Sequence, residues 1–411
     1  MSADRTERVL AELAARRRFG MKPGLDAVSA VLARLGDPHR RLRAVHVAGT
    51  NGKGAVTALL AAALPGRVAR YTSPHLVRLN ERFVLDGRPL PDEVLAPAAE
   101  AVLAASADIP DLTFFEALTA VAFRVFADAE ADWAVLETGL GGRLDATNVC
   151  RSALSVITRI GLDHCDWLGH TLAEIAAEKG GIVKPGVPVV VGRNAAEALD
   201  VLRRIAAEKG APFHYAPDLA DEADIPPDFP LAGPFNRENA VTAIAALRVL
   251  GRPAANFGRV VWPGRFQTVG DFIVDGAHNP PAAAALAAAL GERFPGGERL
   301  SLVAGFCGDK DADTVLRTLA PRVARAWAVR TANPRSLPAE ETAAKMREAG
   351  IDGAVAAPSL AAALEAARAA GGHALVCGSL FLAGEALVAL GAYPWPSDRT
   401  DPSELLKGDG A

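Results

Sequence analysis

The sequence predicts an α/β fold in which a larger domain built on a mostly parallel sheet is followed by a smaller Rossmann-like α/β domain. Three observations support this prediction. Short apolar runs rich in β-branched residues end at glycine or a polar residue, and helical runs follow them in two separate series. Strands that alternate with helices form parallel sheets covered on both faces. A chain of 411 residues, 50% of them hydrophobic, is also long enough to build two cores.

The elements follow one another in a regular order. In the first series, strands are expected at 42–49, 132–139, 152–160 and 187–192, and helices at 55–64 and 171–182. In the second series, strands are expected at 271–278, 299–306, 325–330 and 373–379, with a helix over 280–290. Between the two series, residues 248–258 contain the turn residues expected of a domain boundary. We therefore place the domains at residues 1–256 and 257–411.

Charge, apolar runs and cysteines exclude several classes of protein. The net charge is −4 and the pI is about 6.1, so we expect neither a nucleic-acid partner nor a membrane surface. The start of the chain lacks the apolar stretch of a secretory leader, and runs such as 282–290 are too short to span a membrane. The cysteines at 150, 165, 307 and 377 form no CxxC pair and are expected to be free thiols. We therefore expect a cytoplasmic protein.

The strongest single motif is GTNGKGAV at residues 49–56, which follows a predicted strand and opens a predicted helix. Glycines let backbone N–H groups approach phosphate oxygens, the helix N-terminus favours negative charge, and Lys53 can neutralise terminal phosphates. The strict pattern is not met, because Val47 occupies the first glycine position and Gly54 follows the lysine. The alternative is a glycine-rich turn without a ligand. We predict a P-loop-type ATPase domain whose ATP contacts are Gly49, Thr50, Asn51, Gly52, Lys53, Gly54 and Ala55.

Several longer segments occur in a fixed order and carry a specific resemblance. They are HVAGTNGKG (46–54), YTSPHLVRLNERF (71–83), TFFEALT (113–119), ETGLGGRLDATN (137–148), LDHCDWLGHTLAEIAAEKGGIVKPG (162–186), PGRFQ (263–267) and DGAHNP (275–280). Together they resemble the folate branch of the Mur ligase superfamily, dihydrofolate synthase/folylpolyglutamate synthase. Weaker similarity extends over 308–311, 333–341 and 378–381.

This resemblance implies an ATP-dependent ligase that forms an amide bond between L-glutamate and a pteridine carboxylate, either dihydropteroate or a folate polyglutamate. In such a reaction the carboxylate attacks the γ-phosphate of ATP, and the amine of glutamate then attacks the acyl phosphate. The resemblance also implies one or two Mg²⁺ ions as cofactor. We expect a monomer whose partners are these small molecules. The chemistry needs no serine nucleophile, and the sequence has no GxSxG motif.

The resemblance assigns metal binding to Ser73, Glu137 and His164. Glu137 ends a predicted strand, where an open α/β sheet places its ligand crevice, and hydroxyl, carboxylate and imidazole groups can surround a divalent ion. The alternatives are a capping or salt-bridged Glu137 and a hydrogen-bonded His164 at a strand end. Lys53, Lys179 and His164 are the predicted catalytic residues.

Lys179 matches the family lysine that carbon dioxide carbamylates, which turns a cation into a carboxylate that supports the metal and phosphate site. The alternative is a solvated charge at a helix end. A lysine must be neutral before it reacts with carbon dioxide, so carbamylation requires a buried setting that lowers the pKa of the amine.

Further ATP contacts are implied at Asn239, Arg265, Asp275 and His278, the last three of them in the second domain. A nucleotide held between two domains would let domain closure exclude water from a hydrolysable intermediate. The alternatives are an interdomain salt bridge for Arg265 and a helix-start cap for Asn239.

The pteridine is expected in a flat, partly apolar slot with a few polar contacts. The family's dihydropteroate contacts fall on Thr113, Phe114, Phe115 and Glu116, and on Leu144, Asp145 and Ala146. Adjacent side chains point in different directions, so one of the two phenylalanines is expected to belong to the core.

Two positions depart from the family, and three rival functions stay open. Ala55 replaces the Ser or Thr that usually follows GKG, and Phe235-Asn236 stands where many members have His-Gln. Another Mur-type amino-acid ligase would share the ATP chemistry but would lack the SPHL, NERF and TxFE combination. A non-catalytic ATP-binding family member would conflict with the intact catalytic and metal residues. A P-loop kinase would leave the DGAHNP segment unexplained.

Overall fold

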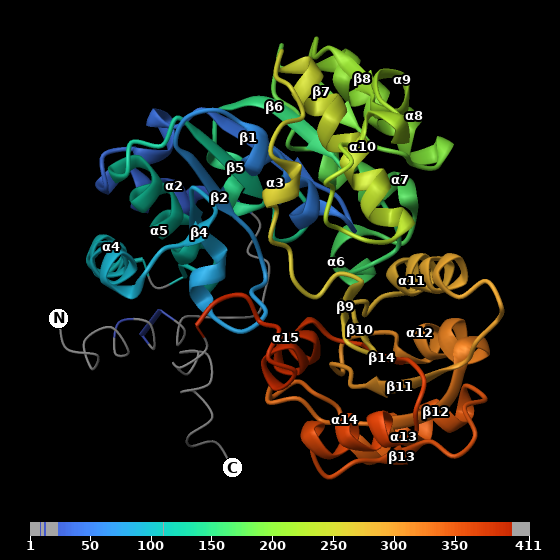
Figure 1. The fold of residues 1–411 in the computed structure, drawn as a ribbon. Helices are drawn as coiled ribbons and strands as arrows, with labels where there is room; N and C mark the ends of the chain where they lie inside the picture. Colours follow the sequence, from blue (N-terminus) through green and yellow to red (C-terminus); the bar gives the residue numbers. More distant parts are fainter. Residues whose placement is uncertain (1–8, 10–11, 14–23, 110, 397–411) are drawn as a thin grey trace.

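Two separate sheets organise the chain in the computed structural model, and in Figure 1 the second one, orange to red, lies below the first. The structure describes residues 9, 12–13, 24–109 and 111–396. The N-terminal stretch that argues against a secretory leader lies mostly outside these residues.

The first sheet, within the described residues, has eight strands in the order β4-β3-β2-β5-β1-β6-β7-β8. They are β1 Ala44–Ala48, β2 Val68–Tyr71, β3 Phe83–Leu85, β4 Arg88–Pro89, β5 Trp133–Glu137, β6 Ser152–Ile157, β7 Val189–Val191 and β8 Phe213–Tyr215. The strands from β2 to β8 in this order are parallel, whereas β3 and β4 extend the edge in antiparallel fashion. Val47 of β1 lies opposite Glu137, so the loop after β1 and the polar end of β5 share one edge.

Helices cover both faces of this sheet. On one face, α3 (Lys53–Ala63) and α10 (Pro234–Val249) pack over a core of strand valines. On the other face lie α2 (Asp26–Arg34), α4 (Asp92–Ala105), α5 (Phe114–Asp128), α7 (Leu172–Gly180) and α8 (Ala196–Glu208). The shorter elements are α6 Cys165–Leu168, α9 Ala216–Leu219 and the 3-10 turns η1 Pro38–Arg41, η2 Leu79–Arg82, η3 Ala146–Val149, η4 Glu222–Asp224 and η5 Phe257–Arg259.

The second sheet has the order β13-β12-β11-β14-β10-β9. Its strands are β9 Gln267–Val269, β10 Phe272–Val274, β11 Leu300–Ala304, β12 Val323–Ala328, β13 Val355–Ala356 and β14 Ala374–Cys377. All pairs are parallel except β9 with β10. One face is covered by α11 (Pro280–Arg293), α12 (Ala312–Leu319) and α13 (Ala339–Glu348), and the other by α14 (Leu360–Ala369) and α15 (Leu380–Ala389); η6 is Ala320–Arg322.

The predicted fold class is confirmed, because two mostly parallel α/β sheets follow one another along the chain. The short antiparallel strands β3, β4 and β9 lie outside the predicted strands, since two or three residues give no clear periodicity. Phe257 and Val260 pack in the core under α3, and the second sheet begins at Gln267. The division of the domains at 256 and 257 stays a prediction.

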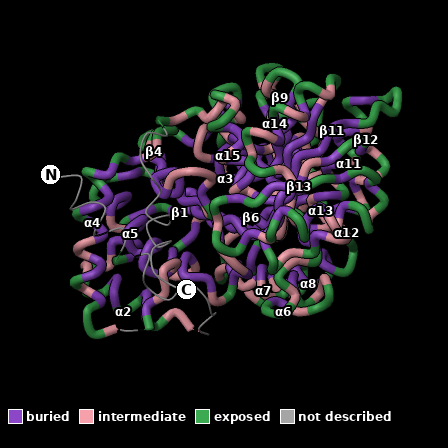
Figure 2. The backbone as a smooth tube through the Cα atoms, turned by 90° about the horizontal axis from the view of Figure 1, so that it is seen from below, coloured by how far each residue is buried: buried purple, intermediate pink, exposed green. Residues whose placement is uncertain are grey.

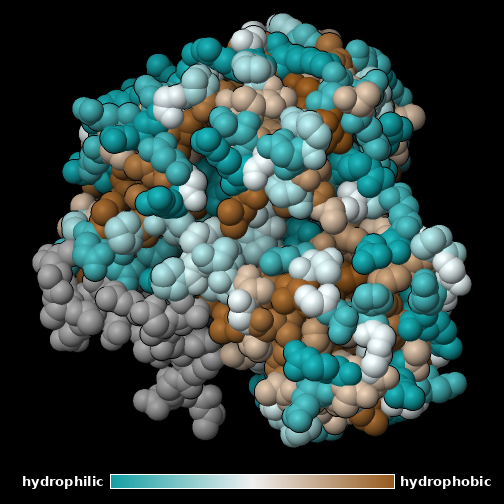
Figure 3. Space-filling view, in the orientation of Figure 1, coloured by the Kyte–Doolittle hydropathy of each residue, from teal (hydrophilic) through white to brown (hydrophobic). Residues whose placement is uncertain are grey.

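The central strands of both sheets are mostly buried, whereas the edge strands β4, β8, β9 and β13 are partly exposed and exposed turns lie around the sheets (Figure 2). The face of the molecule in Figure 3 mixes hydrophilic and hydrophobic residues. None of the helices in the described part of the chain is long and apolar enough to cross a membrane.

Candidate active site

A cavity of about 730 Å³ lies between the two sheets and is lined by both halves of the chain. The first sheet contributes the loop after β1, the end of β5 and the loop after β6. The second sheet contributes the loops after β10, β11 and β14. Ligands of open α/β sheets bind at the carboxyl ends of the strands, and here two such edges face one space.

The glycine-rich loop forms one wall of this cavity, and all seven predicted residues from Gly49 to Ala55 line it. Gly49 and Gly52 adopt φ of +151° and +86°, and a Cβ on Gly52 would lie 2.2 Å from Asn239 Oδ1. The first helical bond of α3 runs from Val56 N to Gly52 O. The amides of Thr50 and Asn51 donate to Arg159 O, so the amides left for a ligand are those of Lys53, Gly54 and Ala55 at the helix start. Lys53 Nζ donates to Thr50 O at 3.2 Å, which keeps the ammonium beside the loop.

The three predicted metal residues line the same cavity. Ser73 N donates to Glu137 Oε2 at 3.1 Å, so the end of β5 and the turn after β2 are joined. Burial raises the pKa of Glu137, while Lys53, the Ser73 amide, Arg265 and Arg70 act in the opposite direction. His164 has a φ of 53° at the start of α6, and burial lowers the pKa of its imidazole.

These donors fit a divalent ion, because hydroxyl, carboxylate and imidazole groups can all serve as metal ligands. One hydroxyl, one carboxylate and one imidazole supply too few ligands for an all-protein site. Consistent with this, the described residues contain no group of three or more His, Cys, Asp or Glu side chains that could hold a metal ion. A nucleotide would therefore have to share the ion.

Lys179 also lines the cavity, and its side chain is buried rather than solvated at the helix end. Burial lowers the pKa of its amine to about 7, and the nearby charge of Lys53 adds to this effect. Within the described chain, the Lys179 amine has no hydrogen-bond or ion-pair partner. This is the setting that reaction with carbon dioxide requires.

The predicted ATP residues after α3 also line the cavity. Asp275, at the end of β10, accepts hydrogen bonds from Phe266 N and Ala277 N, each at 2.7 Å. His278 Nδ1 donates to Gly276 O at 2.7 Å, and burial lowers the pKa of the imidazole to about 4, so the ring is neutral. The second domain therefore presents a preformed polar turn to the P-loop side.

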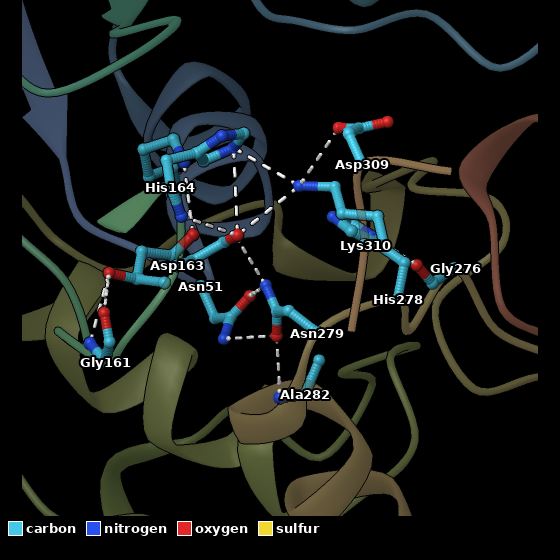
Figure 4. A network of polar contacts seen from close by, with 12 residues as sticks. Asn51, Gly161, Asp163, His164, Gly276, His278, Asn279, Ala282, Asp309 and Lys310 are labelled. Carbon is cyan, nitrogen blue, oxygen red and sulfur yellow. Dashed lines mark hydrogen bonds and ion pairs between the residues drawn. The ribbon is translucent and has the colours of Figure 1, made fainter. Parts of the chain in front are cut away.

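A polar network that the sequence did not reveal crosses the cavity (Figure 4). Lys310 Nζ, from the loop after β11, lies 3.3 Å from Asp163 Oδ1 and 3.4 Å from His164 Nε2. Asn279 Nδ2 donates to Asp163 Oδ2 at 2.7 Å, and Asn51 Nδ2 donates to Asn279 Oδ1 at 3.3 Å. Three residues were therefore missed: Asp163, Asn279 and Lys310. The available signals were that all three lie within the family-like segments LDH, DGAHNP and GDKD.

None of the seven predicted pteridine contacts lines this cavity. Thr113 and Glu116 form the capping box that begins α5. Asp145 is buried, and its carboxylate accepts from Gly139 N, Leu140 N and the amide and hydroxyl of Thr147.

The phenylalanines of the predicted pteridine segment connect to the cavity only through a neighbour. A Cβ on Gly139 would lie 2.6 Å from the Phe115 ring, and Gly139 itself lines the cavity. Phe114 and Phe115 both pack half-buried against the core under α5, with Arg82 Cζ 6.0 Å from the centroid of the Phe114 ring. The segment therefore lies behind the end of β5 rather than beside the P-loop.

Known proteins resemble this chain along most of its length. Residues 264–380 match the family "Mur ligase, glutamate ligase domain". The dihydrofolate synthase/folylpolyglutamate synthase of Bacillus subtilis (strain 168) is 36% identical over 347 residues, which are 74% of this chain and 80% of that protein.

Solved structures show the same similarity. E. coli FolC in complex with DHPP and ADP aligns with a TM-score of 0.84 at 33% identity, over 94% of this chain and 98% of that one. The bifunctional folylpolyglutamate synthase/dihydrofolate synthase of Yersinia pestis complexed with AMPPNP and Mn ion aligns with a TM-score of 0.82 at 30% identity, over 94% and 98%. Both relatives hold a nucleotide, and the second also holds a divalent metal ion.

Proposed function

Because the chain belongs to the dihydrofolate synthase/folylpolyglutamate synthase family, we propose that the cavity between its two sheets is where glutamate is ligated. The protein is an ATP-dependent ligase that joins L-glutamate to a pteridine carboxylate, dihydropteroate and/or a folate polyglutamate, through an acyl phosphate, and releases ADP and phosphate. The observation that carries the assignment of the site is that the P-loop, Asn239 and the polar turn of the second domain line one cavity.

The nucleotide is assigned to the P-loop side. Free amides at the start of α3 and the ammonium of Lys53 supply donors and positive charge for the phosphates. Asn239, Arg265, Asp275 and His278 close the site from the opposite side, so the adenosine part would bridge both halves of the chain. Lys53 then stabilises the charge that develops when a carboxylate attacks the γ-phosphate.

The relative from Yersinia pestis holds a Mn ion together with AMPPNP, which supports a divalent metal beside the nucleotide. In this chain Ser73, Glu137 and His164 are the residues that would hold it, because they share the cavity with Lys53. When bound, such an ion would supply positive charge that offsets the charge of the phosphates. Glu137 is kept in place by the Ser73 amide, so the carboxylate needs little reorganisation.

Lys179 is proposed to be carbamylated. The neutral amine nitrogen would bond to the carbon of carbon dioxide and release a proton, leaving a carbamate with one negative charge. A buried amine with a pKa near 7 is about half neutral at physiological pH, which supports this reaction. Lys179→Ala should lose activity, with partial rescue by short carboxylic acids; an unmodified ammonium in a high-resolution nucleotide complex would contradict the proposal.

The pteridine is proposed to bind behind the end of β5. The supporting observation is that Phe115 packs on Gly139, a residue of the cavity wall, so a flat ligand between them would lie next to the metal and phosphate site. Thr113, Phe114, Phe115 and Glu116 would form one side, and Leu144, Asp145 and Ala146 the other. An opening there would require the side chains of Phe114 and Phe115 to move.

The oligomeric state, the domain boundary and the cellular location stay proposals. We infer that the protein is a monomer and that its two domains divide between residues 256 and 257. We also infer a cytosolic location, since all four cysteines are free thiols in the structure.

The test of the proposed function is a phosphate-release assay with ATP, magnesium and L-glutamate. Dihydropteroate, tetrahydrofolate and a muramyl peptide are compared as the carboxylate. Release with either pteridine, accompanied by a glutamylated product in a mass spectrum, supports the assignment and shows which of the two activities is present. Release with the muramyl peptide alone would move the protein to another branch of the Mur-type ligases.

A further inference from the structure

Arg70 occupies a position that the strand pattern reserves for an apolar side chain. In β2, Ala69 and Tyr71 face the core under α5, and Val68 faces the core under α3. Side chains alternate along a strand, so Arg70 points to the α3 side with Val68. Only 6% of the residue is exposed. A guanidinium therefore lies beside the apolar side chains of the core under α3.

This guanidinium is not paired. Within the described chain it makes no hydrogen bond and no ion pair, and its buried Nε has no partner. Burial lowers the pKa of Arg70 to about 10, against the opposing effect of Glu137 and Glu81, so the group stays charged at neutral pH. A buried charge without a partner destabilises a fold, and such a group in a native protein calls for a functional explanation.

The contact that Arg70 does make leads to the nucleotide cavity. Its Cζ lies 5.3 Å from the centroid of the Trp262 ring, and Arg265 Cζ lies 5.9 Å from the same centroid. Trp262 lines the cavity and packs on the P-loop, where a Cβ on Gly54 would lie 2.1 Å from the ring. The indole therefore connects two guanidinium groups to the start of α3.

We propose that Arg70 is a positioning residue for the nucleotide: its cation–π contact holds Trp262 against Gly54 and beside Arg265. Arg70 itself does not line the cavity, so it acts through Trp262. Its charge, with those of Lys53 and Arg265, also surrounds Glu137 with cations and favours a polyanionic ligand. The proposal rests on the ATP-binding part of the proposed function and does not depend on the carboxylate substrate.

The test compares Arg70→Met, Arg70→Lys and, as a matched control, Arg88→Met, which removes an exposed arginine from β4 of the same sheet. Three quantities are measured on the full chain: the Tm without ligand, the Kd for ATP by calorimetry, and the steady-state KM and kcat. Arg70→Met should weaken ATP binding roughly tenfold, in line with the loss of a desolvated cation–π contact, and should change kcat by less than about threefold.

The Tm separates this role from a structural one. Arg70→Met should leave the ligand-free Tm unchanged or raise it, because an apolar stem replaces an unpaired buried charge. Arg70→Lys keeps the charge and should recover part of the ATP affinity, and Arg88→Met should match wild type. In a Trp262→Leu background, Arg70→Met should have no further effect on the Kd.

Several results would overturn the proposal. They are an Arg70→Met variant with wild-type ATP affinity, a loss of ligand-free stability with unchanged affinity, or an equal loss of affinity in Arg88→Met. If Arg70→Met does not fold, the proposal is overturned by an Arg70→Lys variant that has a wild-type Kd for ATP and a lowered Tm. If the wild-type protein binds ATP but does not ligate glutamate, the proposed reaction is wrong. The role of Arg70 in ATP binding can still be tested in that case.

Discussion

Lys53 and Lys179 line the same cavity in different surroundings. The ammonium of Lys53 is held by the carbonyl of Thr50, where it can meet a phosphate. The amine of Lys179 is buried without a partner in the described chain, and its pKa falls to about 7. Lys53 is suited to stay positively charged, whereas Lys179 is suited to release its proton and become neutral. The two lysines therefore lead to different predictions.

Lys53→Ala should abolish turnover while the fold is kept. The side chain makes one hydrogen bond, at 3.2 Å and within its own loop, so little stability is lost. The developing charge on the γ-phosphate loses its fixed cation, and kcat should fall by about 10²–10³-fold or more. The measurement is kcat together with Tm. A folded variant with near-normal kcat would refute the assignment of the P-loop.

Lys179 should make stability depend on pH in carbon-dioxide-free buffer. Its folded pKa, about 7, lies below the ordinary lysine pKa of 10.5, so between these values the unfolded chain binds a proton that the native state has released. Stability should therefore rise as pH increases from about 7 towards 10. Lys179→Met should lack this part of the rise. Parallel Tm curves for wild type and variant from pH 7 to 10 would contradict a depressed pKa.

Among the site residues, the sequence predicted those that lie on a regular motif. The P-loop follows a strand and opens a helix, so its position at the sheet edge followed from the pattern alone. Lys310 was missed, because nothing in a single sequence says that a loop of the second sheet reaches His164 of the first. The contacts of Asp145 also could not be predicted, since its four hydrogen bonds arise from one turn closing on itself.

At the scale of elements, the longer central strands were predictable, whereas the short parallel strands β2, β8 and β13 and the antiparallel edges were not. β1, β5, β6 and β7 are apolar runs bounded by glycine or polar residues, and each lies inside a predicted strand. β3 and β4 form only because the chain turns back after η2 and finds the free edge of β2. That pairing is a tertiary event without periodicity of its own.

Thr113→Ala tests whether the start of α5 supports both the helix and the pteridine. Thr113 Oγ1 donates to Glu116 Oε2 at 2.7 Å and accepts from Glu116 N at 3.2 Å. Losing this cap should cost about 1 kcal/mol of stability. We expect the KM for the pteridine to rise as well, because the cap fixes the turn that carries Phe114 and Phe115. Thr113→Ser should restore both the Tm and the KM for the pteridine. If Thr113→Ala lowers the Tm but leaves this KM unchanged, the start of α5 has only a structural role.

At the scale of the whole molecule, the polar network at the cavity (Figure 4) is one of several contacts between the two halves, which also meet where Tyr393 contacts Glu81 and where Arg237 pairs with Glu292. Lys310 crosses from the second sheet to Asp163, and both side chains are 13% exposed. Burial tends to raise the pKa of Asp163, but Lys310, His164 and His278 outweigh it and bring the value to about 2. The ionised carboxylate therefore stabilises the contact above about pH 4, and the stabilisation is lost as pH falls towards 2.

Lys310→Met should loosen the ligand-free molecule without unfolding either half. Removing one partner of a mostly buried pair costs up to about 3 kcal/mol, because the remaining carboxylate stays mostly buried and keeps only the hydrogen bonds from Asn279 Nδ2 and His164 N. That cost falls on the contact between the halves rather than on either core. The radius of gyration from small-angle X-ray scattering should therefore increase in the variant, and the excess should shrink when wild type and variant are compared below about pH 3.

The matched control is Lys345→Met, which removes a lysine that pairs with Asp313 at 3.1 Å inside the second half of the chain. It should leave the radius of gyration unchanged, because α12 and α13 are also packed through their apolar faces. An unchanged radius in Lys310→Met would mean that the other contacts between the halves hold them together without Lys310. An equal increase of the radius of gyration in both variants would place the effect within the second half of the chain. The polar network would then form because the two halves are in contact and would not hold them together.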